Sequence, residues 1–315
     1  MADDKILPIR FNKFLGLNTI DNPVRLVVGK ESVKLTQATN VDVNNDMSLS
    51  SRYGFRLVLS GKGKSIGPHG LHILNENLCQ LVHYNDGSVI SNILLPNVGN
   101  NPMSYADAFD SIYFTNNQVI GWVSNGIVYN IPFPTYESSG LPITYKLPVP
   151  FGNILEYAFG RLWIAKDNYI IHSDSGTGIN RYDARNGIGI TLGSNITLLK
   201  AVDTGLFVSD SSGVHYFNGR NPLKLDRKHL SDYPALPGQH WTQRNLTITF
   251  KGNTHTFSTA ILFPTTQGLC VGGDNGAFHN LTEFEILMPS ATSAASLWRR
   301  LNGIDQYICT MITSN

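Results

Sequence analysis

Short runs of β-branched and aromatic residues, separated by turn dipeptides, occupy most of this 315-residue chain. Asp86-Gly87 lies between two such runs and Asn125-Gly126 lies between two more. These dipeptides are the strongest short-range signal for a β-hairpin. No window carries apolar residues at helical spacing over several turns, and the nearest approach is the short stretch 290–297. The pattern predicts an all-β fold.

The hairpins also recur along the chain. Segments 205–213 and 268–276 align without a gap, each being an apolar strand, a tight turn ending in glycine and a second strand. Weaker copies complete the series at 78–90, 111–120, 161–171 and 306–312. Intervals between hairpin centres scatter around the ~40–50 residues of a four-stranded propeller blade. We expect a β-propeller of about five to seven blades, with N-terminal strands from 11–60 completing the last blade beside the C-terminal strand.

Two proline-containing connections interrupt the repeat, at 131–150 and 226–245. Such segments are stiff and are candidate contact arms between blades or with partners. Because the repeat continues on both sides of each connection, residues 1–315 are expected to form a single domain.

Charge is low and balanced. Charged residues make up 15% of the chain, against ~25% in ordinary soluble domains. Lys and Arg number 24 and Asp and Glu 23, which argues against binding a polyanion through bulk charge. A chain with so few charges relies on polar loops or on partners for solubility, which favours a subunit of a larger assembly.

The three cysteines, Cys79, Cys270 and Cys309, lie in unrelated apolar runs whose spacing fits no zinc or redox motif. We expect them to be reduced and buried, as small hydrophobic residues. No apolar run approaches the ~18 residues of a membrane span. The polar N-terminal residues Met1–Lys5 do not resemble a signal peptide, so synthesis in a cytoplasm is expected.

Catalytic motifs are absent from the sequence. His69 and His72 have no matching carboxylate for a metal site. Gly63-Lys64-Ser65 matches only the tail of a phosphate-binding loop, because Val58 stands where the first glycine is required. Segment 173–177 departs from the sialidase Asp-box, and Asp174, Asp183 and Asp203 are interpreted as turn acids. We therefore expect a protein that is not an enzyme, with no cofactor and no metal.

Arginines are the most informative charges in the sequence. Five of them are candidates for lining a channel or an interface: Arg161, Arg181, Arg185, Arg299 and Arg300. If several face one mouth of a ring, they can contact DNA phosphates without sequence specificity. The alternative is ordinary pairing with carboxylates.

Several segments of the chain carry patterns that occur together in one family. Residues 38–56 are similar to an "Ala-x-Asn-Val-Asp-Val … Arg-x-Gly" opening, although Asp46-Met47-Ser48 replaces an expected glycine and predicts a longer first hairpin. Residues 160–165 with 171–174 are similar to a "Gly-Arg-Leu-Trp-Val-Ala … Tyr-Ser-Asp" blade, and further similarities follow at 205–208, 268–282 and 302–307. In this order the segments resemble β-propeller-like structural proteins of tailed bacteriophages.

This resemblance implies a virion protein of the phage tail or neck, such as a tail nozzle subunit. Such a subunit is expected to be a homo-oligomer around the DNA exit channel, joined to adaptor or fibre proteins and without contact to a membrane. It implies no catalytic residues. Two alternatives stay open: a tail-tip propeller that binds a host glycan through Trp122, Trp163 or Trp241, and, ranked last, a propeller glycosidase.

Overall fold

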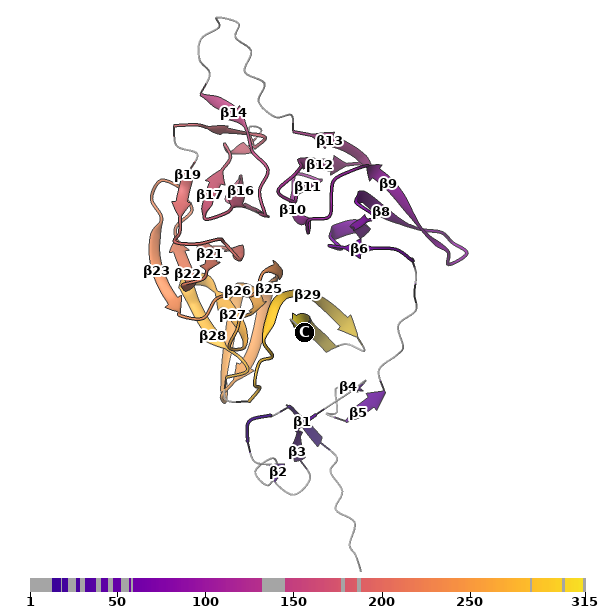
Figure 1. The fold of residues 1–315 in the computed structure, drawn as a ribbon. Helices are drawn as coiled ribbons and strands as arrows, with labels where there is room; N and C mark the ends of the chain where they lie inside the picture. The colour runs from indigo at the N-terminus through magenta and orange to yellow at the C-terminus, as the bar shows by residue number, and fades with distance from the viewer. Residues whose placement is uncertain are drawn as a thin grey trace, which may run out of the picture.

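The computed structural model confirms an all-β chain (Figure 1). It describes residues 13–17, 19–21, 27–28, 32–37, 41–44, 48–51, 57, 59–131, 145–176, 179–185, 188–283, 285–301 and 304–313. Most described residues belong to antiparallel sheets, and the helical elements that the structure describes in full are two short 3₁₀ turns, Pro68–Gly70 and Asp274–Gly276. In the described part of the chain no helix has the length and apolar character needed to cross a membrane.

Five four-stranded antiparallel sheets follow one another in chain order, here numbered 1 to 5. Sheet 1 contains β6 (Gly63–Lys64), β7 (Leu71–Leu74), β8 (Asn77–His83) and β9 (Val89–Leu95). Sheet 2 contains β10 (Ser104–Ala108), β11 (Ser111–Thr115), β12 (Ile120–Ser124) and β13 (Ile127–Asn130). Sheet 3 contains β15 (Ile154–Ala158), β16 (Arg161–Lys166), β17 (Tyr169–His172) and β19 (Ile188–Thr191).

Sheets 4 and 5 continue the same order of strands. Sheet 4 contains β20 (Leu198–Val202), β21 (Gly205–Asp210), β22 (Gly213–Asn218) and β23 (Asp226–Ser231). Sheet 5 contains β25 (Trp241–Phe250), β26 (Asn253–Pro264), β27 (Leu269–Gly273) and β28 (Ala277–Asn280). The last strands, β29 (Ala291–Leu301) and β30 (Ile304–Thr313), form a hairpin called here the terminal hairpin.

The predicted turns form for local reasons. At the β12–β13 turn Asn125 and Gly126 both adopt positive φ, 50° and 74°, which the right-handed twist of a two-residue hairpin requires. At the β8–β9 turn Gly87 has φ 81°, and Asp86 Oδ1 accepts the backbone N–H of Ser88 at 2.8 Å. Both hairpin predictions are confirmed.

Each sheet is apolar on the faces that meet its neighbours, and a separate apolar cluster fills each junction. Phe114 is among the residues between sheets 1 and 2, and Leu162 among those between sheets 2 and 3. Trp163 and Leu206 pack between sheets 3 and 4, and Phe263 is in the cluster shared by sheets 4 and 5. Sheets buried on both faces explain the continuous apolar strands in the sequence.

The sheets follow an arc in which the first strands of sheets 2 to 5 are neighbours. β10 contacts β15, β15 contacts β20, and β20 contacts β25. The fourth strands β9, β13, β19, β23 and β28 lie at the periphery (Figure 1). Sheet 1 stands at one end of the arc and the terminal hairpin at the other, separated in this view.

In sheets 2 and 4, a buried hydroxyl near the end of the second strand bonds to the connection that leads to the next sheet. Thr115 Oγ1 donates to the carbonyl of Val119 at 2.9 Å and accepts the N–H of Gly152 at 3.0 Å. Ser209 Oγ likewise donates to the carbonyl of Gly213 and accepts the N–H of Ala235, both at 2.9 Å. One side chain thus satisfies both a hairpin and the chain entering the next sheet.

The N-terminal strands do not complete the last sheet among the described residues, contrary to expectation. β1 (Lys13–Leu17), β3 (Ser32–Leu35) and β2 (Val27–Val28) form their own sheet, and β4 (Val41–Val43) pairs with β5 (Leu49–Ser51). The strand added to the terminal hairpin is instead β24 (Gly238–Gln239), parallel to β29. Backbone bonding of Thr19 to Glu285 holds the N-terminal sheet beside the connection between sheet 5 and the terminal hairpin.

Other expectations meet mixed outcomes. The stretch 290–297 becomes part of strand β29. All three cysteines are free; Cys79 and Cys270 are buried as expected, whereas Cys309 is half-buried.

Residues 45–47, 132–144 and 302–303 lie outside the described residues, and with them the replaced glycine of the first turn and most of the first proline-containing connection. From that connection the structure describes β14 (Lys146–Pro148), which pairs with β18 (Arg181–Asp183).

Candidate assembly surface and polar sites

The five predicted arginines lie in three separate places. Arg181 and Arg185 belong to the small β14–β18 sheet and its following turn, and Arg299 and Arg300 lie near the tip of the terminal hairpin. Arg161 begins β16 of sheet 3. No described contact joins these three groups.

Several of these arginines contact polar or acidic side chains close to them in the fold. Arg185 donates two hydrogen bonds to the carboxylate of Asp183, at 2.9 and 2.6 Å, and stacks over the ring of Tyr145. The hydrogen bonds from Arg185 hold the pKa of Asp183 well below its usual range, with Lys146 adding a smaller effect. Arg299 donates to Gln306 at 2.7 Å, and Arg300 lies 3.8 Å from Asp305.

Arg161 lines an open pocket of about 550 Å³ between sheets 3 and 4. Its lining residues are Phe159, Arg161, Ser175, Arg220, Asn221 and Pro222. Arg161 Nη1 donates to the carbonyl of Ser173 at 2.9 Å, and Arg220 Nε donates to the carbonyl of Asp203 at 2.7 Å. The described lining thus holds two guanidinium groups and no carboxylate.

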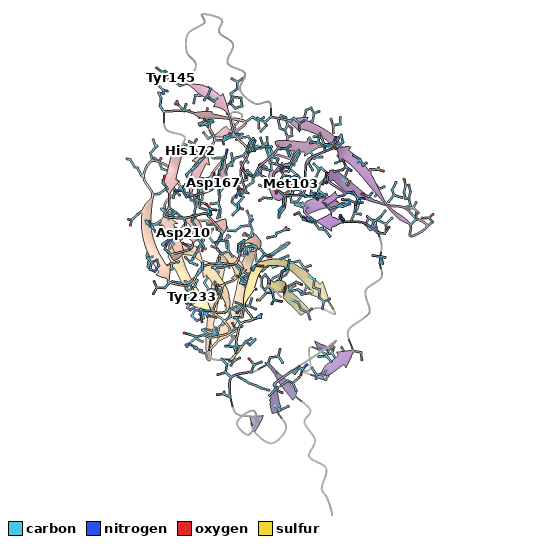
Figure 2. The ribbon with its side chains drawn as sticks, in the orientation of Figure 1. Met103, Tyr145, Asp167, His172, Asp210 and Tyr233 are labelled. Carbon is cyan, nitrogen blue, oxygen red and sulfur yellow. The ribbon has the colours of Figure 1, made fainter. Side chains whose placement is uncertain are left out.

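A second polar cluster lies on the β21–β23 part of sheet 4. Asp210, labelled in Figure 2, ends β21 and accepts a hydrogen bond from Ser212 Oγ at 2.6 Å. Ser212 Oγ is also 3.1 Å from Nε2 of His215, whose Nδ1 is 3.2 Å from Nδ1 of His229. His229 Nε2 lies 2.7 Å from Asp232.

Burial and neighbouring charge set the protonation of this cluster. Burial, and next the charge of Arg227, lowers the pKa of His215. Burial alone would raise the pKa of Asp210, but the hydrogen bonds from Ser212 and the contact with His215 outweigh it and lower the pKa. An ionised Asp210 beside a neutral His215 is therefore the stable state of this pair near neutral pH.

The remaining sequence candidates make local contacts. His72 lies within hydrogen-bond distance of the Gly70 carbonyl and of Ser91 Oγ, both at 2.9 Å. The described residues contain no group of three or more histidine, cysteine or acidic side chains placed to hold a metal ion. Asp174 accepts two bonds from Lys146, at 2.8 and 2.7 Å. Lys64 donates to the carbonyl of Asn100.

The three tryptophans considered for sugar stacking differ in burial. Trp163 is fully buried, so it is part of the core. Trp122 is half-buried and lies in a cross-strand row between Tyr113, with ring centroids 5.8 Å apart, and Tyr129, at 5.1 Å and nearly parallel. Trp241 is also half-buried, and its Nε1 donates to Gln243 at 3.2 Å.

Apolar side chains are exposed at both ends of the arc. On the terminal hairpin, Leu297 and Ile312 are 48% and 61% exposed, on the face opposite to Trp298, which packs toward sheet 5. On sheet 1, Ile93 of β9 is 61% exposed. Strand β30 pairs only with β29 among the described strands, so its other edge has no described partner. We call Ile93, Leu297 and Ile312 together the end surfaces.

No protein-family model matches this chain, and no curated protein matches it.

Sequence reasoning identified Arg161 but missed Arg220 and the Asp210–His215–His229 cluster. Arg220 follows β22 on sheet 4, so it reaches Arg161 only through the packing of two sheets. His215 and His229 face each other because β22 and β23 pair in register. The adjacent acid and serines of Asp210-Ser211-Ser212-Gly213 are a turn signal, and they gave no hint of the partner across the sheet.

Proposed function

We propose that the five sheets and the terminal hairpin are blades of a β-propeller, and that the protein is a non-enzymatic structural subunit of a phage tail or neck. The order of the sheets, the contacts between successive first strands and the apolar cluster at every junction support a propeller. In this proposal the terminal hairpin is an incomplete last blade. Copies of the chain form a ring around the DNA exit channel and bind adaptor or fibre proteins.

The observation that carries the assembly role is the exposure of apolar side chains on the end surfaces. Leu297, Ile312 and Ile93 lie on strands rather than on loop tips, and an uncovered strand edge with exposed apolar residues favours pairing with another chain. The low charge of the chain also supports this role, because charged side chains normally prevent a free strand edge from pairing with another chain. Resemblance to phage tail proteins supplies the context.

Native mass spectrometry of the purified full-length chain, over a concentration series, tests this proposal. Oligomers of one defined size, or capture by tail proteins of the same particle, are expected. A chain that stays monomeric throughout and also joins no tail protein contradicts the assembly role. High-resolution imaging of the same sample tests the propeller directly, since sheets that do not radiate from a common axis would contradict it.

Recognition of a host glycan is the second candidate. The supporting observation is the Tyr113–Trp122–Tyr129 row, in which Tyr129 is 42% exposed at the outer strand of sheet 2. Exposed aromatic faces stack on sugar rings. A glycan array with wild type and Trp122→Ala separates the two: binding that disappears in the variant favours recognition, and absence of binding removes this candidate.

A further inference from the structure

The pocket between sheets 3 and 4 presents two cationic side chains that no described acid neutralises. Arg161 enters from the start of β16, and Arg220 enters from the loop after β22. Within the described residues neither guanidinium makes an ion pair with a carboxylate. Two like charges in one pocket create a positive potential that an anion relieves.

The protein holds both guanidinium groups in place and leaves some of their N–H donors free. A guanidinium has five N–H donors in a planar fork. Arg161 commits Nη1 to the carbonyl of Ser173, and Arg220 commits Nε to the carbonyl of Asp203. Arg220 also lies over the ring of Phe159, 5.9 Å from its centroid. These contacts reduce the entropy lost on binding and leave several donors on each arginine for a ligand.

The rest of the pocket favours a polar ligand of small size. Ser175 and Asn221 add neutral polar groups to the lining, and the buried Pro222 supplies a rigid wall. Asn221 Oδ1 already accepts the N–H of Leu223 at 3.0 Å, which orients its amide group. A volume of about 550 Å³ lies within the range of small-molecule sites.

We propose that this pocket binds a phosphate group. One guanidinium fork satisfies both oxygens of a planar carboxylate, so a carboxylate ligand needs a single arginine. A tetrahedral phosphate has additional oxygens and a second negative charge, so it can engage two guanidinium groups approaching from different sheets. The site stands apart from the assembly role, because it depends on sheets 3 and 4 and not on the end surfaces.

The test uses the full-length chain and isothermal titration with inorganic phosphate, followed by acetate at the same ionic strength. Phosphate is expected to bind with a dissociation constant on the order of 1 mM or tighter, and acetate more weakly. Arg220→Gln, which changes an exposed side chain, is expected to weaken phosphate binding by about tenfold or more. Arg181→Gln, an exposed arginine outside the pocket, is the matched control and leaves the affinity unchanged.

Competition experiments identify the source of the phosphate. A nucleoside monophosphate that displaces inorganic phosphate, while a short single-stranded oligonucleotide does not, indicates a free phosphate ester. Displacement by the oligonucleotide indicates the phosphates of a nucleic-acid backbone. The proposal is overturned if phosphate does not bind, or if Arg220→Gln and Arg161→Gln, shown to be folded by circular dichroism, bind it as wild type does.

Discussion

Glu156 of β15 and Lys200 of β20 form an ion pair across the junction of sheets 3 and 4, with 2.8 Å between Oε2 and Nζ. Both side chains are largely covered, at 12% and 19% exposure. The second carboxylate oxygen accepts the N–H of Ala201 at 3.4 Å. Polar groups placed at a junction otherwise filled by apolar residues fix how the two sheets align, because a shifted arrangement would leave both charges unpaired.

Removing one partner of this pair is expected to cost more than removing both. Lys200→Met leaves the Glu156 carboxylate without its counter-ion and should lower the free energy of unfolding by about 2–3 kcal/mol. Glu156→Gln with Lys200→Met together should cost less than the sum of the single changes. Urea unfolding of the four proteins of this cycle measures the coupling. Strict additivity would show that the pair does not stabilise the junction.

The hydroxyl of Thr115 joins a hairpin to the next sheet, and an isosteric replacement tests that role. Thr115→Val leaves the N–H of Gly152 without its acceptor and should destabilise by about 2 kcal/mol. Thr265 is the comparison, because its hydroxyl donates to the carbonyl of Gly268 at 2.9 Å and accepts the N–H of Gln267 at 3.2 Å, both within its own hairpin, and accepts no described bond from the connection to the next sheet. Thr265→Val should cost less than Thr115→Val, because Gln267 is exposed and water can replace the lost acceptor. Equal losses in urea unfolding would contradict the joining role.

Acid sensitivity is expected from His240. Burial, and next the charge of Lys200, lowers its pKa from 6.5 to about 4. Between these values the unfolded chain takes up a proton that the folded chain does not, so stability is complete above pH 6.5 and falls as the pH drops toward 4. The loss across this window amounts to roughly 3 kcal/mol.

The variant His240→Gln measures this contribution, because glutamine does not titrate. Between pH 6.5 and 4 its free energy of unfolding should fall less steeply than that of wild type. The difference in slope corresponds to about one proton fewer taken up on unfolding. His215 and His279 also have lowered pKa values, caused first by burial, so some acid sensitivity persists. Identical slopes for variant and wild type would rule out His240 as the main source.

Charge on the end surfaces should weaken assembly without unfolding the chain. Ile312→Glu and Ile93→Glu each place a carboxylate on an exposed strand position and are expected to raise the dissociation constant of the oligomer by about tenfold or more. Asn92→Glu adds the same charge to β9 at the neighbouring exposed position, whose side chain points to the other face. Light scattering compares the three; an Asn92→Glu effect as large as the others would point to net charge alone.

Local turn chemistry explains why the hairpins could be predicted. Asp86-Gly87 and Asn125-Gly126 determine their turns within four residues, whatever the rest of the chain does. No local sequence pattern shows which position a strand occupies within its sheet. The gapless alignment of 205–213 with 268–276 matched the second strand of sheet 4 to the third strand of sheet 5, since any apolar hairpin ending in glycine looks alike.

Long-range packing explains what sequence reasoning missed. Arg161 was a candidate because arginine opening an apolar strand is conspicuous, but its partner Arg220 lies on another sheet and is adjacent only in the fold. The five arginines do not gather at one place, and Arg185 is paired with Asp183, as local sequence proximity allows. The strand that pairs with β29 is β24 rather than an N-terminal strand, and this pairing depends on three-dimensional packing that no local pattern records.

Cryo-electron microscopy of intact particles that carry this chain tests the central proposal most directly. The account predicts a symmetric ring of copies around the tail axis, with the strands bearing Ile93 and Ile312 at contacts between subunits. Particles that carry the chain as isolated copies, with these strands facing solvent, would contradict it.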